Sequence, residues 1–383
     1  MSARPDVGIF FGRPDRCHAL AGELRRRGFP VTVYNDPGAP GTDVPVRCAF
    51  GPALVRLAAS RHDVYLTSLS FVPSLSLALN RCLRGCPYVF NATGLKRAMY
   101  RDRARRWAAP WVAERLVYPA LTRLVLAGAA RIVCNSHYLE RRLRAAYPRH
   151  AAKMCTVYNG IDVARFAPAA APRPAGATAP TLVAVMTWNY PGKAAAARLL
   201  IDAMGPITGR YPGARLVIAA KMAHGRYRPA IEAALAAKPW RDAVGIVVNH
   251  PRVEELLATA DLFLYATAPD SNDSLPRALL EAQAAGLAVV TTATAGCPEI
   301  VEDGVTGYVV PCDAAALADR ALDLLGDPDR RVAFGRQGRA RVATLFSWAR
   351  MGEAYARLFL EIAAGRTRQA RAVPSQPLSG ARS

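Results

Sequence analysis

Two carboxylates with seven residues between them, Asp273 and Glu281, mark the stretch of this 383-residue chain where chemistry is easiest to place. Asp273 precedes a predicted helix, and Glu281 lies inside that helix, between Leu280 and Ala282. An ionised carboxylate among apolar side chains is unfavourable unless something pairs with it. Glu281 therefore either reaches water at the edge of the apolar face or binds a ligand, and the sequence that follows favours the ligand.

The elements that position this pair form a predicted helix followed by a strand. Ser274 is, like Asp273, a capping residue type, and Pro276 suits a first helical turn because no partner is needed for its missing N–H. Gly286 is predicted to end the helix. Residues 287–292 are a continuous apolar, β-branched run of the kind buried in parallel sheets. The polar start of such a helix is a natural place to hold an anion.

A lysine earlier in the chain is placed to meet such an anion. Residues 181–186 read as a buried strand, and Gly192 and Lys193 then open a helix that runs to about Met204. A lysine at a helix start, directly after a strand and a glycine, is suited to a phosphate group. The alternative interpretation is a lysine that faces solvent.

The two strings that follow Asp273-x7-Glu281 are LEAQAAGLAVV and AGCPEIVEDGVTGYVV. Together they resemble the carboxy-terminal donor site of the retaining family 4 glycosyltransferases, which have the GT-B fold. The signature of that family is two acidic residues separated by seven, then LEA-x-A-x-G-x-PVV, then GG-x-PE-I-V-x-DG-x-x-G. The resemblance is strongest from Thr181 to about Tyr355.

The resemblance implies an α/β fold of the GT-B type, with two doubly wound Rossmann-like domains facing each other across a cleft. The alternation of predicted strands and helices along both halves of the chain favours doubly wound sheets on its own. The predicted divisions are an acceptor-side domain at 1–167, a Pro- and Ala-rich linker at 168–180, a nucleotide-sugar domain at 181–346, a helix at 347–364 crossing back to the first domain, and a disordered basic tail at 365–383.

The resemblance also assigns roles to residues. Glu281 would accept hydrogen bonds from the ribose hydroxyls of a nucleotide sugar, and Asp273 would bind hydroxyls of its sugar. Lys193 would stabilise charge on the leaving diphosphate, so Asp273 and Lys193 are the catalytic candidates. The other predicted donor-binding residues are Gly12, Asn189, Asn249, His250, Ser274 and Leu275.

The chain departs from the family pattern at three positions. Asp273 stands where the family has a longer glutamate, and Thr187 stands where an arginine usually shares the phosphate with the lysine. Thr93 stands where the family has an acceptor-side histidine.

The charge balance points to an anionic partner for the first half of the chain. Lys and Arg number 50 against 29 Asp and Glu, a net charge of +21. Basic residues concentrate in the segment 96–106, next to Trp107 and Trp111. A solvated helix face is one interpretation, and contact with a lipid-phosphate acceptor or an anionic membrane is the other. The predicted acceptor or membrane residues are Thr93, Lys96, Arg97 and Arg101. Nucleic acid is not an expected partner, because no recognition motif accompanies the charge.

Cysteine usage and hydropathy bear on location and cofactors. The eight cysteines are scattered without a Cys-x-x-Cys pair, which disfavours a metal site and fits a reducing compartment. No signal peptide or membrane-spanning run is expected. The predicted location is the cytoplasm, with peripheral attachment to the inner face of the cell membrane as a further hypothesis. No catalytic metal and no cofactor are predicted.

The predicted function is a retaining glycosyltransferase that moves a sugar from a UDP- or GDP-sugar to an acceptor hydroxyl. The acceptor would be a carbohydrate or a lipid-linked molecule, as in cell-surface polysaccharide or glycolipid synthesis. Two alternatives stay open: a catalytically silent nucleotide-sugar binder or scaffold, and a nucleotide-sugar epimerase of the same fold.

Overall fold

The computed structural model describes residues 4–10, 14–35, 38–39, 41–45, 59–68, 71–92, 116–166, 179–188, 191–221, 227–269 and 273–372. The chain divides into two compact units. Unit 1 comprises Met1–Cys134, Arg144–Val157 and Met351–Ser383. Unit 2 comprises Asn135–Leu143 and Tyr158–Arg350.

Unit 1 is built on a parallel sheet whose described strands lie in the order β3-β2-β1-β4-β5-β6-β7. The strands are β1 (Val7–Phe10), β2 (Val31–Asn35), β3 (Val44–Pro45), β4 (Val64–Ser68), β5 (Tyr88–Ala92), β6 (Arg131–Cys134) and β7 (Met154–Thr156). The helices are α1 (Pro14–Arg26), α3 (Phe71–Arg84), α6 (Tyr118–Gly128), α7 (His137–Ala146), whose first residues belong to unit 2, and α15 (Trp348–Ala372), with a 3-10 turn η2 (Pro148–Lys153).

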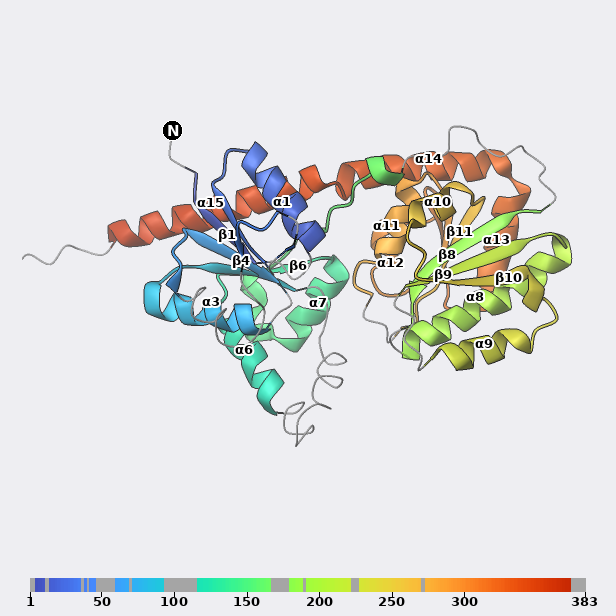
Figure 1. Ribbon diagram of the computed structural model, residues 1–383, viewed down its shortest axis with the longest axis horizontal. Helices are drawn as coiled ribbons and strands as arrows, with labels where there is room; N and C mark the ends of the chain where they lie inside the picture. The colour runs from blue at the N-terminus through green and yellow to red at the C-terminus, as the bar shows by residue number, and fades with distance from the viewer. Residues whose placement is uncertain are drawn as a thin grey trace, which may run out of the picture. The chain divides into compact units, whose positions relative to one another are not determined.

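Strands β1, β4 and β5, in the middle of this sheet, are buried over their whole length, which is the pattern of a sheet covered on both faces. Helix α1 packs on β1 and β2, whereas α3 and α6 pack together near β4 and β5 (Figure 1). Helix α15 returns to this unit, where its Gly352 lies against Glu23 of α1.

Unit 2 holds a second parallel sheet, with its described strands in the order β10-β9-β8-β11-β12-β13. The strands are β8 (Thr181–Thr187), β9 (Arg215–Lys221), β10 (Val244–Val248), β11 (Leu262–Tyr265), β12 (Val289–Thr292) and β13 (Gly307–Val310). The helices are α8 (Pro191–Arg210), α9 (Arg228–Ala236), α10 (Val253–Ala258), α11 (Arg277–Ala284), α12 (Cys297–Ile300), α13 (Ala314–Gly326) and α14 (Pro328–Leu345), with 3-10 turns η3 (Ala164–Phe166) and η4 (Arg241–Ala243).

Successive residues of these strands point to opposite faces of the sheet, and each face has its own core. Leu262 and Leu264 of β11 join one buried cluster with residues of α8 and α13. Phe263 and Tyr265, between and beyond them, join a second cluster with residues of α10, α11 and α14. The unit is therefore a three-layer sandwich, in which α8 and α11 lie on different faces of the sheet (Figure 1).

Helix ends follow the sequence in some places and depart from it in others. Gly286 takes a left-handed conformation with φ 76° directly after α11, as its position predicted. Helix α11 begins only at Arg277, with Pro276 at the N-cap position and no side-chain cap, so the predicted capping by Asp273 and Ser274 is wrong. The chain is still extended at Pro276, and this keeps Asp273 away from the helix amides.

Helix α15 continues to Ala372, beyond the predicted end near Ala364. Its added residues include Arg, Gln and Ala, which favour helix over most alternatives. Across the parts of the chain described above, none of the helices combines the length and apolar character needed to cross a bilayer.

Candidate active site

The order in which the chain adds strands to the sheet of unit 2 reverses between β8 and β11. The candidate site residues lie near this point, which we call the switch point. From β8 the chain order runs outward through β9 and β10 on one side, and through β11, β12 and β13 on the other. In such sheets ligands bind beyond the carboxyl ends of the strands where the order reverses. Lys193 lies at the start of the helix after β8, Tyr265 is the last residue of β11, and Asp273 follows it.

These three side chains form one hydrogen-bonded group, which we call the Asp273 cluster. Lys193 Nζ donates to Asp273 Oδ2 and forms an ion pair with it. The Tyr265 hydroxyl donates to the same oxygen at 2.7 Å, and Lys193 Nζ lies 3.4 Å from that hydroxyl. Because an ammonium has three N–H donors, Lys193 can hold Asp273 and still donate to a ligand.

Burial sets the protonation of the groups around the Asp273 carboxylate. The Tyr265 side chain is fully buried, and burial together with the nearby Asp273 charge raises its pKa well above the usual value. Burial also raises the pKa of the Cys297 thiol to about 12. Tyr265 is therefore a neutral hydrogen-bond donor, and Cys297 is a thiol that does not serve as a nucleophilic thiolate.

The backbone that carries Asp273 is held by the turn before α12. Gly296 N donates to Asp273 O at 3.1 Å, and a Cβ at position 296 would lie 1.9 Å from Ser274 O. Only glycine fits this approach. Its neighbour Ala295 has φ 53°, a left-handed conformation that is uncommon for a residue with a Cβ. Asp273 is thus held at its main chain by Gly296 and at its side chain by Lys193 and Tyr265.

Glu281 belongs to a second group of charges. Arg277 Nε donates to Glu281 Oε1 at 2.8 Å from one turn earlier in α11. Burial raises the pKa of Glu281, while the positive charges of Arg277, Lys221 and Arg165 act in the opposite direction. The sequence left water and a ligand as the possible partners of Glu281. The structure adds Arg277 as a third partner.

Two further predicted residues follow β10 at the same edge of the sheet. Asn249 is exposed and left-handed, with φ 53°, and its N–H donates to Ala220 O at 2.9 Å, next to Lys221 at the end of β9. His250 Nδ1 accepts from Arg252 N at 3.3 Å. Lys221, Asn249 and the Asp273 cluster therefore lie at or beyond the carboxyl ends of neighbouring strands.

The remaining predicted residues divide between placed and undescribed ones. Ser274 is buried against Gly296, Leu275 packs beside the second core cluster, and Thr187 ends β8 opposite Lys221. Six predicted site residues lie outside the described residues: Gly12, Thr93, Lys96, Arg97, Arg101 and Asn189. Most of the predicted linker lies outside them as well.

Sequence reasoning missed Tyr265, Arg277 and Glu299. Arg277 lies four residues before Glu281, the spacing at which helical side chains meet, so this signal was available. Tyr265, a polar aromatic at the end of an apolar strand, was a weaker signal. The backbone N–H groups of His137 and Tyr138, at the start of α7, donate to the Glu299 carboxylate, and so does the Tyr158 hydroxyl at 3.0 Å. Glu299 and its three donors are so far apart in the sequence that no local pattern predicts these contacts.

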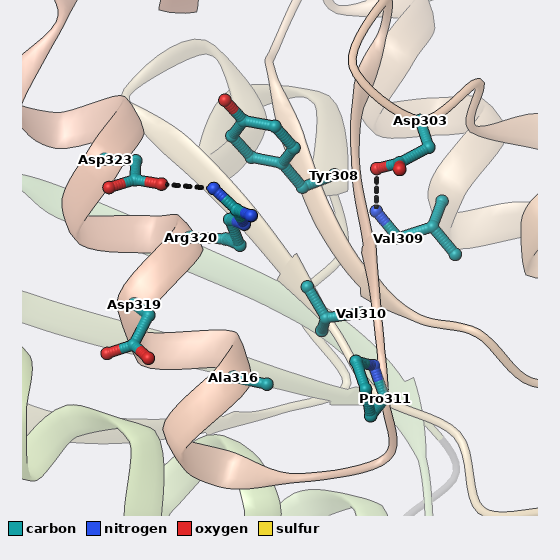
Figure 2. A pocket seen from close by; sticks show the side chains of 9 residues that line it. All are labelled: Asp303, Tyr308, Val309, Val310, Pro311, Ala316, Asp319, Arg320 and Asp323. Atoms are coloured by element: carbon teal, nitrogen blue, oxygen red, sulfur yellow. Dashed lines mark hydrogen bonds and ion pairs between the residues drawn. The ribbon is translucent and has the colours of Figure 1, made fainter.

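A separate pocket of about 520 Å³ lies between β13 and α13. Figure 2 shows Arg320 extended toward Asp323 beside the Tyr308 ring, with Asp303 and Asp319 on other parts of the lining. Arg320 is already paired with Asp323 at 2.7 Å and lies over the Tyr308 ring. With three carboxylates and one engaged guanidinium, this pocket is unsuited to a diphosphate. It shares no lining residue with the Asp273 cluster.

Among the described residues, no group of three or more His, Cys, Asp or Glu side chains is arranged to hold a metal ion. Lys193 places a positive charge at the switch point, and Lys221 places another at the end of β9.

Solved structures share this architecture over nearly the whole chain. A glycosyltransferase from Rickettsia africae matches with a TM-score of 0.73 at 15% identity, covering 94% of this chain and 99% of that one. Anabaena HepE, solved with UDP and glucose, matches with a TM-score of 0.71 at 16% identity, covering 93% and 100%. The chain therefore has the GT-B fold of two Rossmann-like parallel sheets.

Two family models place the chain more narrowly. The model described as Glycosyltransferase Family 4 matches residues 16–165, and the model described as Glycosyl transferases group 1 matches residues 179–327. Together they cover more than half of the sequence. The chain belongs to the group 1, family 4 glycosyltransferases.

A curated relative comes from Corynebacterium glutamicum: a GDP-mannose-dependent monoacylated α-(1-6)-phosphatidylinositol monomannoside mannosyltransferase. The two sequences are 32% identical over 232 residues, which is 57% of this chain and 58% of the relative. The chain thus spans less than two thirds of that relative's length.

Proposed function

We propose that this protein is a retaining, hexosyltransferase-type glycosyltransferase that moves a sugar from a UDP- or GDP-sugar to an acceptor hydroxyl. The observation that carries the proposal is the Asp273 cluster at the switch point of unit 2, with Glu281 in the helix that follows. A lysine and two carboxylates match the three parts of a nucleotide sugar: Lys193 the diphosphate, Asp273 the sugar and Glu281 the ribose.

In this proposal each residue meets a different part of the donor. Lys193 keeps its contact with Asp273 and donates to the diphosphate, so that charge on the leaving group is stabilised as it develops. Asp273 accepts from sugar hydroxyls, and Glu281 accepts from the ribose while Arg277 holds its other side. Asn249, His250 and Lys221 line the edge at which the base would lie.

The proposed step exchanges one bond at the anomeric carbon and moves one proton. The acceptor oxygen bonds to the anomeric carbon, while the bond from that carbon to the diphosphate oxygen breaks. The acceptor proton passes to the leaving diphosphate, and the nucleoside diphosphate departs. Attack on the face that the diphosphate leaves would retain the anomeric configuration. The proposal needs no metal and no cofactor, because Lys193 supplies positive charge.

The named relatives bear on the choice of donor and acceptor. The corynebacterial relative is named for GDP-mannose and a phosphatidylinositol mannoside, and Anabaena HepE was solved with UDP and glucose. We propose a nucleotide-sugar donor of one of these two kinds and a carbohydrate or lipid-linked acceptor, as in polysaccharide or glycolipid synthesis.

Donor binding is tested by thermal melting of the full chain against a panel of UDP- and GDP-sugars. A ligand at a hundred times its dissociation constant adds about 2.7 kcal/mol to the free energy of unfolding. We expect one donor class to raise the melting temperature of the wild type and not of Glu281→Ala. Glu232→Ala is the matched control, because Arg228 Nε contacts Glu232 Oε1 at 2.7 Å with the same four-residue spacing on an exposed helix face. A donor effect that survives Glu281→Ala would contradict the assignment.

Product analysis separates transfer from the two alternatives. A transferase releases nucleoside diphosphate only when an acceptor is present and yields a glycoside with the donor's anomeric configuration. An epimerase returns an isomeric sugar without an acceptor, and a silent binder shifts the melting temperature and releases nothing. An inverted anomeric configuration in the glycoside would overturn the retaining mechanism.

For the membrane side of the proposal, unit 1 offers an apolar surface with basic neighbours, which we call the α3–α6 surface. Leu79 and Leu83 of α3 are 40% and 68% exposed, and Leu116 and Leu124 at α6 are 61% and 50% exposed. The two helices pack together, and their basic residues here are Arg81, Arg84 and Arg123. Exposed leucines beside arginines fit the boundary between anionic headgroups and acyl chains. We propose a cytoplasmic protein that attaches peripherally through this surface to the inner face of the membrane.

Sedimentation with lipid vesicles tests this attachment. We expect binding to vesicles with about a third anionic lipid, weaker binding to zwitterionic ones, and loss of binding in the double variant Leu83→Ser and Leu124→Ser. Val332→Ser is the control, because Val332 is a 59% exposed apolar residue of unit 2. Equal binding by the double variant and the control would contradict the proposed surface.

A further inference from the structure

Tyr265 and Asp273 meet in a geometry that the proposed catalytic roles leave unexplained. The Tyr265 hydroxyl and Lys193 Nζ both donate to Oδ2 of Asp273. Among the described residues, the structure gives Oδ1 of Asp273 no hydrogen bond. One oxygen is thus held by two donors and the other is left to accept.

We propose that Tyr265 is a positioning residue that holds the short Asp273 side chain in place of the glutamate found in the family, so that Oδ1 accepts a hydroxyl of the donor sugar. This rests on the proposed function. Two donors converging on one oxygen fix both the distance and the rotation of a carboxylate, whereas a single flexible ammonium leaves the rotation free. Aspartate has one methylene less than glutamate, so its reach and aim depend more on such support.

Tyr265 is well placed to give that support because it does not move easily. It ends a buried central strand, is 2% exposed, and lies parallel to the Phe263 ring with their centroids 6.5 Å apart. Its phenol stays protonated because burial and the Asp273 charge raise its pKa. Side chains locked by packing on a strand hold a reacting group more accurately than side chains on loops.

A hydrogen bond from Gly296 N to Asp273 O holds the main chain of Asp273 as well. The main chain of Asp273 is fixed from the α12 side, and its carboxylate is fixed from the β11 side. If Tyr265 were only a buried phenol satisfied by the nearest acceptor, its loss would affect stability alone. If it positions Asp273, its loss affects turnover, because a displacement of about 1 Å at a reacting centre can lower the rate a hundredfold.

The central experiment is a rescue. In Tyr265→Phe we expect kcat to fall about tenfold to a hundredfold, and kcat/KM for the donor to fall with it. Asp273→Glu is expected to lower kcat in the wild-type background, where the longer side chain meets the Tyr265 hydroxyl. The same change in the Tyr265→Phe background is expected to raise kcat at least fivefold above that of Tyr265→Phe, because the longer glutamate reaches the sugar without the support of Tyr265. Full activity in Tyr265→Phe, or a double variant no better than Tyr265→Phe, would overturn the positioning role.

A second measurement separates this proposal from the proposed function. Melting temperatures of the free protein are compared for Tyr265→Phe, Asp273→Ala and the double variant, because alanine removes the acceptor of the Tyr265 hydroxyl. If the two groups hold each other, the double variant loses less than the two single losses added together. Additive losses would overturn the positioning role even in an active enzyme. Wild-type protein that turns over no nucleotide sugar would refute the proposed function, while non-additive losses would still establish the contact.

Discussion

The two units hold similar polar groups at opposite ends of their strands. In unit 1 the Tyr34 hydroxyl meets His62 Nε2 at 2.7 Å, and His62 Nδ1 meets Asp6 Oδ2 at 2.7 Å. Asp6 precedes β1 and His62 precedes β4, while Tyr34 reaches His62 from within β2. Two of the three members of this group, the His62 cluster, therefore lie where strands begin. In unit 2 the Asp273 cluster also joins a tyrosine to charged groups, but it lies where strands end.

The difference in position matches a difference in backbone strain. The His62 imidazole lies edge-on to Tyr34 and Tyr65, and its two nitrogens are both engaged. Among the described residues, the non-glycine residues with positive φ are Asn249 and Ala295, and both follow carboxyl ends of strands in unit 2. Strained backbone concentrates at functional sites. We therefore treat the His62 cluster as part of the fold and the Asp273 cluster as the proposed site of chemistry, and the variants below test this distinction.

The largest expected effect is loss of turnover in Asp273→Asn. Asparagine keeps the shape and still accepts from Tyr265, but it removes the charge that would bind the sugar in the transition state. We expect kcat to fall about a hundredfold to a thousandfold, with melting close to that of the wild type. Steady-state kinetics together with a melting curve test this, and a stable variant with normal kcat would remove Asp273 from the mechanism.

The second effect is loss of stability in His62→Ala. The substitution leaves a cavity between two tyrosine rings and two hydrogen-bonding groups without their partner. We expect the free energy of unfolding to fall by about 2–3 kcal/mol while kcat per folded molecule is unchanged. Denaturant unfolding and kinetics on the same preparation measure both, and a drop in kcat at constant stability would assign chemistry to the His62 cluster.

A smaller effect comes from Tyr34→Phe, which removes the same atom as Tyr265→Phe but in unit 1. We expect a loss of about 1 kcal/mol in the free energy of unfolding and no change in kcat. Comparing the two variants side by side separates the general cost of losing a buried hydroxyl from the positioning of Asp273. An equal fall in kcat in the two variants would contradict the different roles proposed for the two clusters.

The smallest effect is expected from Ala295→Gly. Glycine takes the left-handed conformation freely, so the change should raise the free energy of unfolding by about 1 kcal/mol or less. Chemical denaturation measures the gain, with Ala293→Gly as a control at an exposed position with ordinary φ. A loss of stability would show that the left-handed conformation carries no strain.

Much of the fold was predictable because its signals are local. Short windows of sequence contain the apolar runs at β6 and β12 and the glycine that ends α11. They also contain the acidic pair, with Asp273 before α11 and Glu281 inside it. The family signature added the hypothesis that the second sheet carries a donor site, which stays a prediction. These features depend on neighbours in the chain, which is what a sequence displays.

The rest depends on strand order and was not predictable in the same way. Tyr265 meets Lys193 because β11 lies beside β8, and nothing near either residue encodes that pairing. The expected capping by Asp273 failed for a related reason, because the partners that the carboxylate found come from other elements. Arg277 is different: its spacing from Glu281 was visible, and the ion pair follows from helical geometry alone.

The chain enters and leaves the main segment of unit 2 through adjacent residues. Ile161 N donates to Phe346 O at 2.8 Å, Ile161 also bridges to Ser347, and Gly160 lies directly against Trp348. A segment whose two ends meet can be cut out, re-inserted or circularly permuted with little change to the remainder. Evolution and protein engineers can therefore exchange this segment between related glycosyltransferases by joining chains where its two ends meet.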